Sequence, residues 1–311
     1  CFHVKINATQ TVSDLVNMLG KAVLEELKPK GRTVWEKFVT TIASIRSEIS
    51  FDINGQPSWS LGLGEIRNPI ATLDEIFSYL QSADRPCIIA IDEFQQIAKY
   101  GDSTVEAMLR TFVQKTTNAH FIFAGSQRHL MNGMFTSPAR PFYQSVTILN
   151  LKPLELGKYI EFANEKFEEA GKHFDPAVLE DLYIRFDGVT SYIHRILNIL
   201  YSRTDKGQVC SVDMVEPTID FVVRISSDTY VSLFYQMPKK QRAVFLAVAS
   251  EGKASEVMGG AFVKRHSLIS ASSVSSAMKG LLDKDFITNE NGVYSVYDKF
   301  FQIWLSKRGL I

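Results

Sequence analysis

The chain has 311 residues, which is too long for one ordinary domain and suits two or three domains of about 100 to 200 residues each. Apolar residues make up 45% of the chain and charged residues 22%, a balance that excludes a disordered or fibrous protein. Lysine plus arginine equals aspartate plus glutamate at 34 each, so the chain as a whole has no excess charge that would attract nucleic acid or an anionic membrane.

Targeting and redox signals are few. No stretch approaches the run of about 18 apolar residues that a membrane span needs, and the chain does not open with a charged and then apolar signal. The three cysteines, Cys1, Cys87 and Cys210, have no metal-binding spacing, so each is interpreted as a small apolar residue or a surface thiol. We expect a cytoplasmic protein with no membrane partner.

The first part of the sequence predicts a strand, two helices and a hairpin. Residues 1–7 alternate in polarity like a strand, and residues 11–27 carry an apolar stripe at helical spacing. Residues 35–45 form a second amphipathic stretch. Residues 49–53 and 59–63 then alternate around an Asn-Gly-Gln-Pro sequence, which predicts an inserted β-hairpin.

The next part alternates helices and strands. A helix is predicted at residues 72–80, and the continuous apolar run at 87–91 suits a buried central strand of a parallel sheet. A helix at 105–115 and strands at 120–126 and 145–151 follow. This alternation is typical of a three-layer α/β domain with right-handed crossovers.

Beyond this domain the pattern changes twice. Residues 156–235 show helical patterns only, and the last part predicts helices at 241–250 and 273–282 and a hairpin over 286–296. The order of the last three elements suits a winged helix. We therefore predict three domains, which are an α/β core at 1–152 with the hairpin insertion near 48–64, a helical domain at 153–236 and a winged helix at 237–311.

Two adjacent carboxylates follow the apolar run at 87–91. Ligands bind at the carboxyl edge of parallel α/β sheets, so Asp92 and Glu93 are expected at a binding edge. Phosphoryl transfer requires an acid that holds Mg²⁺, directly or through water, and a group that polarises the attacking water. We assign Asp92 to the metal and Glu93 to the catalytic base. The alternative is that Asp92 caps the next helix, since aspartate is a favoured N-cap residue.

The strand at 120–126 ends in Gly125 and Ser126, which are expected beside Asp92 in the sheet. A polar group there can sense the terminal phosphate of a nucleotide, so Ser126 is a candidate catalytic and nucleotide-binding residue. The alternative is a simple turn from strand to loop. Arg128 is close enough in sequence to reach phosphate, but we favour a solvated loop arginine.

Arg140 is a third candidate. It lies between Pro138 and Pro141, which stiffen its loop. A rigidly held arginine near a subunit edge suits the stabilisation of transition-state charge in a neighbouring subunit's site. The alternative is a surface or salt-bridge arginine.

Together these residues resemble those of AAA+-type P-loop ATPases. Residues 88–93 look like a Walker B segment, residues 121–126 look like a sensor-1 strand, and Arg140 has a place like that of an arginine finger. Nearly the whole chain resembles the archaeal and bacterial ATPase family related to the origin-recognition and STAND branches of this class. The resemblance implies a parallel P-loop NTPase sheet, a helical lid, a winged helix, and ATP with Mg²⁺ as ligands.

Two later stretches carry the same resemblance. Residues 186–192 are similar to the family's glycine-containing turn into a lid helix, and residues 297–305 look like its closing Asp-x-x-Phe-x-x-Trp-Leu sequence. The lid departs from the wider class, because Thr190 and Ser191 stand where relatives often place an arginine. Arg195, one turn later, is a poor replacement, which puts sensor-2 chemistry in doubt.

A second departure concerns the phosphate-binding loop. The 311 residues contain no Gly-Lys-Thr or Gly-Lys-Ser sequence, whose backbone amides and lysine cradle the phosphates in the family. Because the family places that loop before the strand that residues 2–6 match, we expect an α/β core truncated at its N-terminus, with further residues upstream in the natural protein. We expect the 311 residues alone to be inactive and to bind nucleotide weakly or not at all.

The winged helix offers a thin basic surface for DNA. Its candidate reading helix at 270–279 has hydroxyl groups and Lys279, and Lys264, Arg265 and His266 precede it. The alternative is a protein-binding or autoinhibitory domain whose aromatic side chains are packing residues, which would be Tyr294, Phe300, Phe301 and Trp304.

The sequence as a whole predicts an ATP-binding protein that works as a nucleotide-driven conformational switch, with Mg²⁺-ATP hydrolysed at Asp92 and Glu93. The alternative is a DNA-binding or partner-binding winged-helix adaptor with a vestigial nucleotide site. The expected partners are nucleotide, a protein or further copies of the chain, and DNA through the winged helix.

Overall fold

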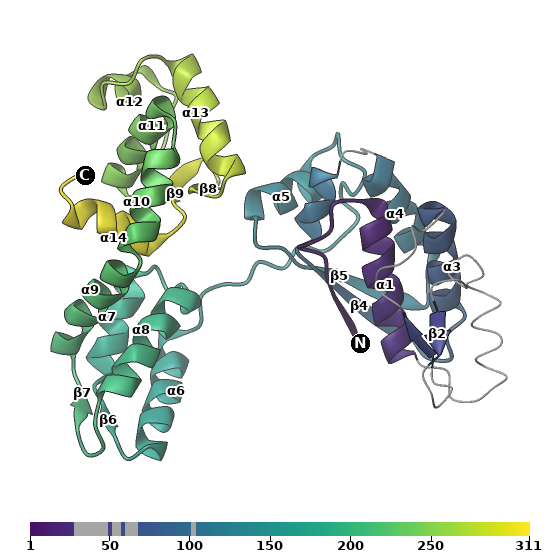
Figure 1. Ribbon diagram of the computed structural model, residues 1–311, viewed down its shortest axis with the longest axis horizontal. Helices are drawn as coiled ribbons and strands as arrows, with labels where there is room; N and C mark the ends of the chain where they lie inside the picture. The colour runs from purple at the N-terminus through teal and green to yellow at the C-terminus, as the bar shows by residue number, and fades with distance from the viewer. Residues whose placement is uncertain (28–48, 52–56, 60–67, 101–103) are drawn as a thin grey trace. The chain divides into compact units, whose positions relative to one another are not determined.

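The computed structural model forms two compact units, unit 1 at Cys1–Ile148 and unit 2 at Leu149–Ile311, which are described separately (Figure 1). The residues that it describes are 1–27, 49–51, 57–59, 68–100 and 104–311. The helix predicted at 35–45 lies outside these ranges. No helix within them is long and apolar enough to cross a bilayer.

Unit 1 is built on a parallel three-stranded sheet. Its strands lie in the order β1-β4-β5, with bounds Phe2–Lys5 for β1, Cys87–Asp92 for β4 and Ala119–Phe123 for β5. Phe2 lies opposite Ile89, so β1 and β4 run in parallel register, as β4 and β5 also do. The carboxyl ends of the three strands therefore meet at one edge of the sheet.

Helices cover one face of this sheet, namely α1 (Val12–Glu26), α3 (Pro69–Gln81) and α4 (Thr104–Lys115) (Figure 1). A capping box starts α1, because Thr11 accepts from the Asp14 N–H and the Asp14 carboxylate accepts from the Thr11 N–H. Phe77 of α3 stacks on Phe112 of α4 and on Phe121 of β5, with ring centroids 5.2 and 5.7 Å apart. These aromatic contacts fix the helices to the sheet.

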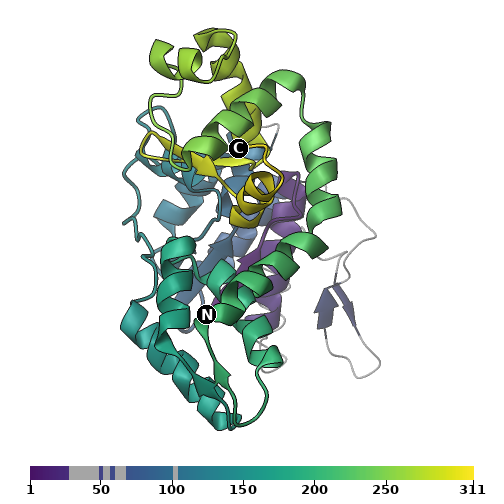
Figure 2. The same ribbon diagram turned by 90° about the vertical axis from the view of Figure 1, so that its left-hand side faces the viewer.

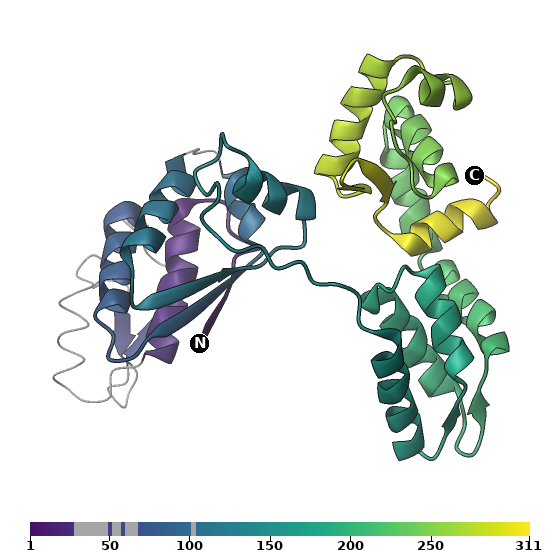
Figure 3. The ribbon, with the colours of Figure 1, turned by 180° about the vertical axis from the view of Figure 1, so that it is seen from behind.

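The opposite face of the sheet is seen in Figure 3, from behind the helices. Ile88 and Ile122 point to this face, and they are 43% and 53% exposed among the described residues. Parallel sheets are usually covered on both faces. The described residues of unit 1 thus supply two layers, a sheet and one helical layer, of the predicted three-layer domain.

Unit 1 is completed by η2 (Phe94–Lys99), α5 (Arg128–Thr136) and an antiparallel pair of β2 (Ile49–Phe51) with β3 (Pro57–Trp59). The second strand of this hairpin begins at Pro57, earlier than predicted, and the turn lies outside the described residues. The strand predicted at 145–151 was wrong. Its alternating apolar residues have no neighbouring strand to pair with in the described part of the chain, and the segment spans the boundary between the units.

Unit 2 begins with a group of helices, which Figure 2 shows in teal and green. These are α6 (Leu156–Glu169), α7 (Pro176–Arg185), α8 (Thr190–Arg203), η3 (Val212–Met214), α9 (Val215–Ile225) and α10 (Ser227–Gln236). The prediction of helices alone was incomplete, because β6 (His173–Phe174) pairs in parallel with β7 (Val209–Cys210). Two-residue strands are too short to leave a periodic pattern in the sequence.

The winged helix follows in the same unit. Its elements are α11 (Lys239–Glu251), α12 (Gly260–Arg265), α13 (Ala271–Asp283), β8 (Ile287–Glu290), β9 (Val293–Val296) and α14 (Lys299–Lys307). The hairpin β8–β9 is antiparallel, with Ile287 opposite Val296. Asp298 caps α14 by accepting from the N–H groups of Phe300 and Phe301.

One hydrophobic core joins the helical group to the winged helix. Phe186, at the end of α7, lies 5.2 Å from the ring of Phe300, and Tyr230 of α10 stacks on Phe301 at 4.7 Å. The indole N–H of Trp304 donates to Oγ of Ser227 at 3.0 Å. Helix α14 of the winged helix is therefore packed into the helical group.

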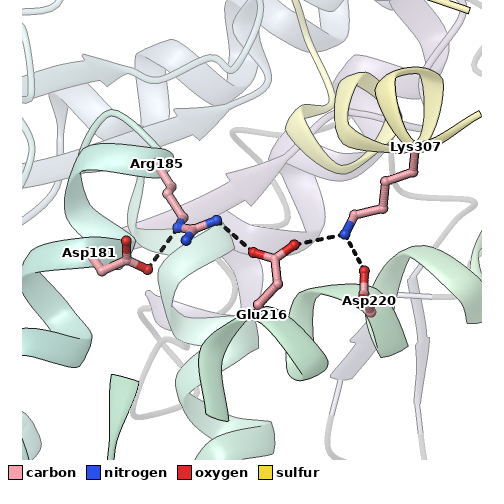
Figure 4. Close-up of polar contacts among 5 residues, drawn as sticks. All are labelled: Asp181, Arg185, Glu216, Asp220 and Lys307. Carbon is pink, nitrogen blue, oxygen red and sulfur yellow. Dashed lines mark hydrogen bonds and ion pairs between the residues drawn. The ribbon is translucent and has the colours of Figure 1, made fainter. Parts of the chain in front are cut away.

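An ion-pair chain runs along the surface of the same junction (Figure 4). Arg185 of α7 contacts Asp181 and Glu216, at 2.7 and 2.8 Å. Lys307 of α14 contacts Glu216 of α9 at 2.7 Å and also Asp220. Each exposed pair contributes about 1 kcal/mol or less, so the buried aromatic contacts dominate the junction.

Candidate functional site

The carboxyl end of β4 turns sharply at Glu93. Its backbone is left-handed, with φ 58° and ψ 38°, a conformation that costs a non-glycine residue about 1–3 kcal/mol. The turn delivers Phe94 into a cluster with Phe123, Phe135 and Phe142, where its ring is fully buried. Burial of this ring offsets the strain at Glu93.

The turn brings the ends of β4 and β5 together. The Ala124 N–H donates to the Ile91 carbonyl, and the Phe94 N–H donates to the Ala124 carbonyl, both at 2.9 Å. Oγ of Ser126 then donates to Oε2 of Glu93 at 2.8 Å. Glu93 and Ser126, two of the predicted site residues, follow neighbouring strands and are thus in direct contact.

Gln95 is a third member of this cluster. Its amide nitrogen donates to the same Glu93 Oε2 atom, and its side chain is 3% exposed. Gly125 lies directly against it, because a Cβ atom on Gly125 would overlap Oε1 of Gln95 and lie 2.7 Å from Sδ of Met131. A side chain at position 125 would therefore displace the Gln95 amide or the end of Met131.

Asp92 lies beside this cluster at the tip of β4. Its Oδ1 accepts from the Glu93 N–H at 3.0 Å, and its Oδ2 lies 3.9 Å from Nε2 of His3 on β1. The alternative interpretation made Asp92 a helix cap, but Glu93 holds the N-cap position of η2, without a side-chain cap bond. The Asp92 side chain is 30% exposed, and Asp92 is the last residue of β4, at the carboxyl edge of the sheet.

Arg140 forms an ion pair within the chain. Its Nη2 lies 2.5 Å from Oε2 of Glu106 on α4, and Glu106 is 5% exposed. Burial raises the pKa of Glu106 above its ordinary value, and the Arg140 guanidinium opposes that rise. The structure therefore places Arg140 against Glu106, a partner that the sequence did not indicate.

Helix α8, which was predicted as the first lid helix, follows a left-handed turn at Asp187 and Gly188, with φ 51° and 69°. Thr190 is exposed at the start of this helix. Arg195 packs with its guanidinium carbon 5.2 Å from the centroid of the Phe300 ring. This cation–π contact within unit 2 gives Arg195 a packing role.

Asp92 fits a role as a magnesium ligand. Mg²⁺ commonly takes one or two protein carboxylates and completes its shell with substrate phosphates and water. Within the described ranges, no cluster of three or more His, Cys, Asp or Glu side chains could hold a metal on its own. The Asp92 carboxylate is partly exposed, so one of its oxygens could be reached by an ion whose other ligands are phosphates and water.

Sequence reasoning missed two residues of this region, Gln95 and Glu106. Gln95 lies in a 3₁₀ helix that shows no period in the sequence, so its burial could not be read from the pattern. Glu106 did leave a signal, because it lies in the buried stripe of α4 with Leu109 and Phe112. A glutamate on an apolar stripe calls for a buried partner.

Comparisons with known proteins agree with this architecture. A family described as "Probable winged helix domain" matches residues 228–307, a range that begins within α10, before the predicted domain start at 237. A search of curated proteins found no match to the sequence.

Among solved structures, the chain is similar to the Walker-type ATPase of Pyrococcus abyssi, with 16% identity, a TM-score of 0.59, and coverage of 98% of this chain and 83% of that one. It also matches the Orc1 protein of Aeropyrum pernix in complex with DNA, at 14% identity, a TM-score of 0.46, and coverage of 99% and 77%. The Thermotoga maritima RuvB Holliday junction branch migration motor matches at 15% identity and a TM-score of 0.37, with coverage of 89% and 97%.

The likeness to the Pyrococcus abyssi protein is close enough to show the fold. The chain has a mixed α/β fold similar to that of the Pyrococcus abyssi protein, built on a parallel sheet and followed by a C-terminal winged helix. The fold predicted from the sequence is confirmed. Fold alone does not define chemistry, which depends on the residues at the edge of the sheet.

Proposed function

We propose that this chain is an ATP-binding AAA+-type ATPase that acts as a nucleotide-driven conformational switch. The hydrogen bond between Ser126 and Glu93 carries the proposal, because it joins a candidate sensor to a candidate base at the carboxyl edge of adjacent strands. Strain at Glu93 supports it, since strained backbone is concentrated at functional sites.

In this proposal, each residue has a separate task. Asp92 would hold Mg²⁺, which neutralises phosphate charge when bound. Oε2 of Glu93 is engaged by Ser126 and Gln95, whereas Oε1 accepts no hydrogen bond from the described residues and is available to take a proton from water. Ser126 would exchange its bond to Glu93 for one to the terminal phosphate, which couples the nucleotide state to the base.

Arg140 would act on the nucleotide of a neighbouring copy of the chain, as an arginine finger does. To do so its guanidinium must release Glu106 or share it, because the two are ion-paired within the chain. The switch would be transmitted through unit 2, whose helical group and winged helix share one core and are proposed to move together as a lid.

DNA binding has weaker support. The basic surface of the winged helix is reduced further because Arg265 pairs with Glu251 at 2.7 Å, and His266 contacts the same carboxylate. Salt-dependent DNA binding requires several free cations. We therefore propose nucleotide as the ligand and a protein, including further copies of the chain, as the partner.

Equilibrium binding of Mg²⁺-ATP tests this proposal. The binding is measured with the full-length natural protein. We expect ATP to bind more tightly with Mg²⁺ than with EDTA, and Asp92→Asn to remove most of that difference. An absence of ATP binding by the full-length protein would favour the adaptor with a vestigial site.

A further inference from the structure

We propose that Gln95 is a positioning residue for the Glu93 carboxylate, a role that rests on the proposed ATPase function. Gln95 was not predicted as a site residue, and its side chain is almost completely buried. It acts on the reaction through Glu93 alone.

The first support is the direction of its hydrogen bond. A glutamate carboxylate can rotate freely about its last torsion, so the oxygen that faces water is undefined until one oxygen is held. The Gln95 amide and the Ser126 hydroxyl both donate to Oε2 of Glu93. When a nucleotide phosphate draws Ser126 away, Gln95 is the donor that still holds Oε2 and leaves Oε1 for water.

The second support is that Gln95 is itself held rigidly. It lies in η2, between the buried residues Phe94 and Ile97, and its side chain is 3% exposed. Gly125 closes the other side, because any side chain at that position would overlap the Gln95 amide. A base held by a fixed donor is pre-organised, and misplacement by about 1 Å costs about a hundredfold in rate.

The third support is an energetic cost. Oε1 of Gln95 is buried and has no hydrogen-bond partner among the described residues. Leaving a buried acceptor unpaired destabilises a protein, and an apolar side chain of the same size would avoid that cost. The Gln95 amide therefore lowers the stability of the fold, and what it provides in return is the hydrogen bond to Glu93.

The test compares Gln95→Met with Gln96→Met in the full-length natural protein. Gln96 is a matched control, because it lies in the same helix and its amide also donates one hydrogen bond, to the Thr9 carbonyl at 3.0 Å. We expect Gln95→Met to lower kcat for ATP by about tenfold to a hundredfold, with unchanged ATP affinity and an equal or higher unfolding temperature. Gln96→Met is expected to retain kcat.

A second variant perturbs the amide without removing it. Gly125→Ala places a methyl group where the Gln95 amide lies, so the amide must shift. We expect this variant to lower kcat, as Gln95→Met does. Full kcat in Gln95→Met, in a preparation where Glu93→Gln is inactive, would overturn the positioning role and leave the ATPase proposal intact. An absence of turnover in the wild-type protein would overturn both.

Discussion

Replacement of Arg140 by alanine separates a structural role from a catalytic one. Arg140 supplies the counter-charge of Glu106, whose side chain is almost completely buried. Breaking a buried ion pair costs about 3–5 kcal/mol, but the Arg140 side chain is 37% exposed and solvent screens part of the interaction. We therefore expect Arg140→Ala to lower the free energy of unfolding by about 2–3 kcal/mol at neutral pH.

The pH dependence of this loss identifies Glu106 as its cause. A raised carboxyl pKa gives stability that is fully present below the unfolded-state value, here 4.5, and is lost as pH rises through the folded-state value. Arg140→Ala removes the charge that opposes the rise, so the pKa of Glu106 rises further. The difference from wild type should be small near pH 4.5 and should increase toward neutral pH.

Urea unfolding at several pH values measures this difference. The double variant Glu106→Gln with Arg140→Ala buries no charge, so its stability relative to wild type should not change with pH in this way. An Arg140→Ala protein with wild-type stability, or with a loss that does not depend on pH, would refute the buried-pair reasoning. If such a stable Arg140→Ala protein lost ATPase activity, that loss could be assigned to the proposed arginine-finger role.

Further predictions concern the junction inside unit 2. Asp298→Ala removes the cap of α14 and the acceptor of the Tyr230 hydroxyl at 3.0 Å, and should lower the unfolding free energy in urea by about 2–4 kcal/mol. Burial raises the pKa of Tyr192 from 10.0 to about 12. The stability that the neutral Tyr192 hydroxyl contributes is therefore complete below pH 10 and is lost as the pH rises toward 12. Between pH 10 and 12, the Tyr192→Phe protein should lose less stability than the wild type. Phe300→Ala should cost about 3–5 kcal/mol and speed hydrogen exchange in both α8 and α11, whereas exchange changed in α11 alone would contradict a shared core.

Much of the α/β core could be predicted from the sequence, because its signals are local. The apolar run before Asp92 and the run before Gly125 became adjacent strands β4 and β5, as parallel-sheet topology requires. The segment at 145–151 shows the limit of this reasoning. Its apolar alternation is compatible with a strand, but strand formation depends on a partner that a local pattern does not reveal.

The candidate site was predictable in part for the same reason. Ser126 and Glu93 are in contact because each follows a predictable strand. Gln95 contacts Glu93 because of the left-handed turn at Glu93, which could not be predicted because the residue at the turn is not a glycine. Arg140 was assigned from its stiff loop, and its partner Glu106 comes from a helix far away in sequence. Contacts of this kind depend on tertiary packing and cannot be read from spacing.

The hydrolysis of ATP by the full-length natural protein, with Glu93→Gln beside it, tests the proposed function most directly. We predict Mg²⁺-dependent turnover in the wild type and a loss of about a hundredfold or more in kcat for Glu93→Gln, with ATP affinity retained. Equal turnover in the two proteins would show that Glu93 is not the base, and an absence of turnover in both would contradict the assignment of this chain as an ATPase.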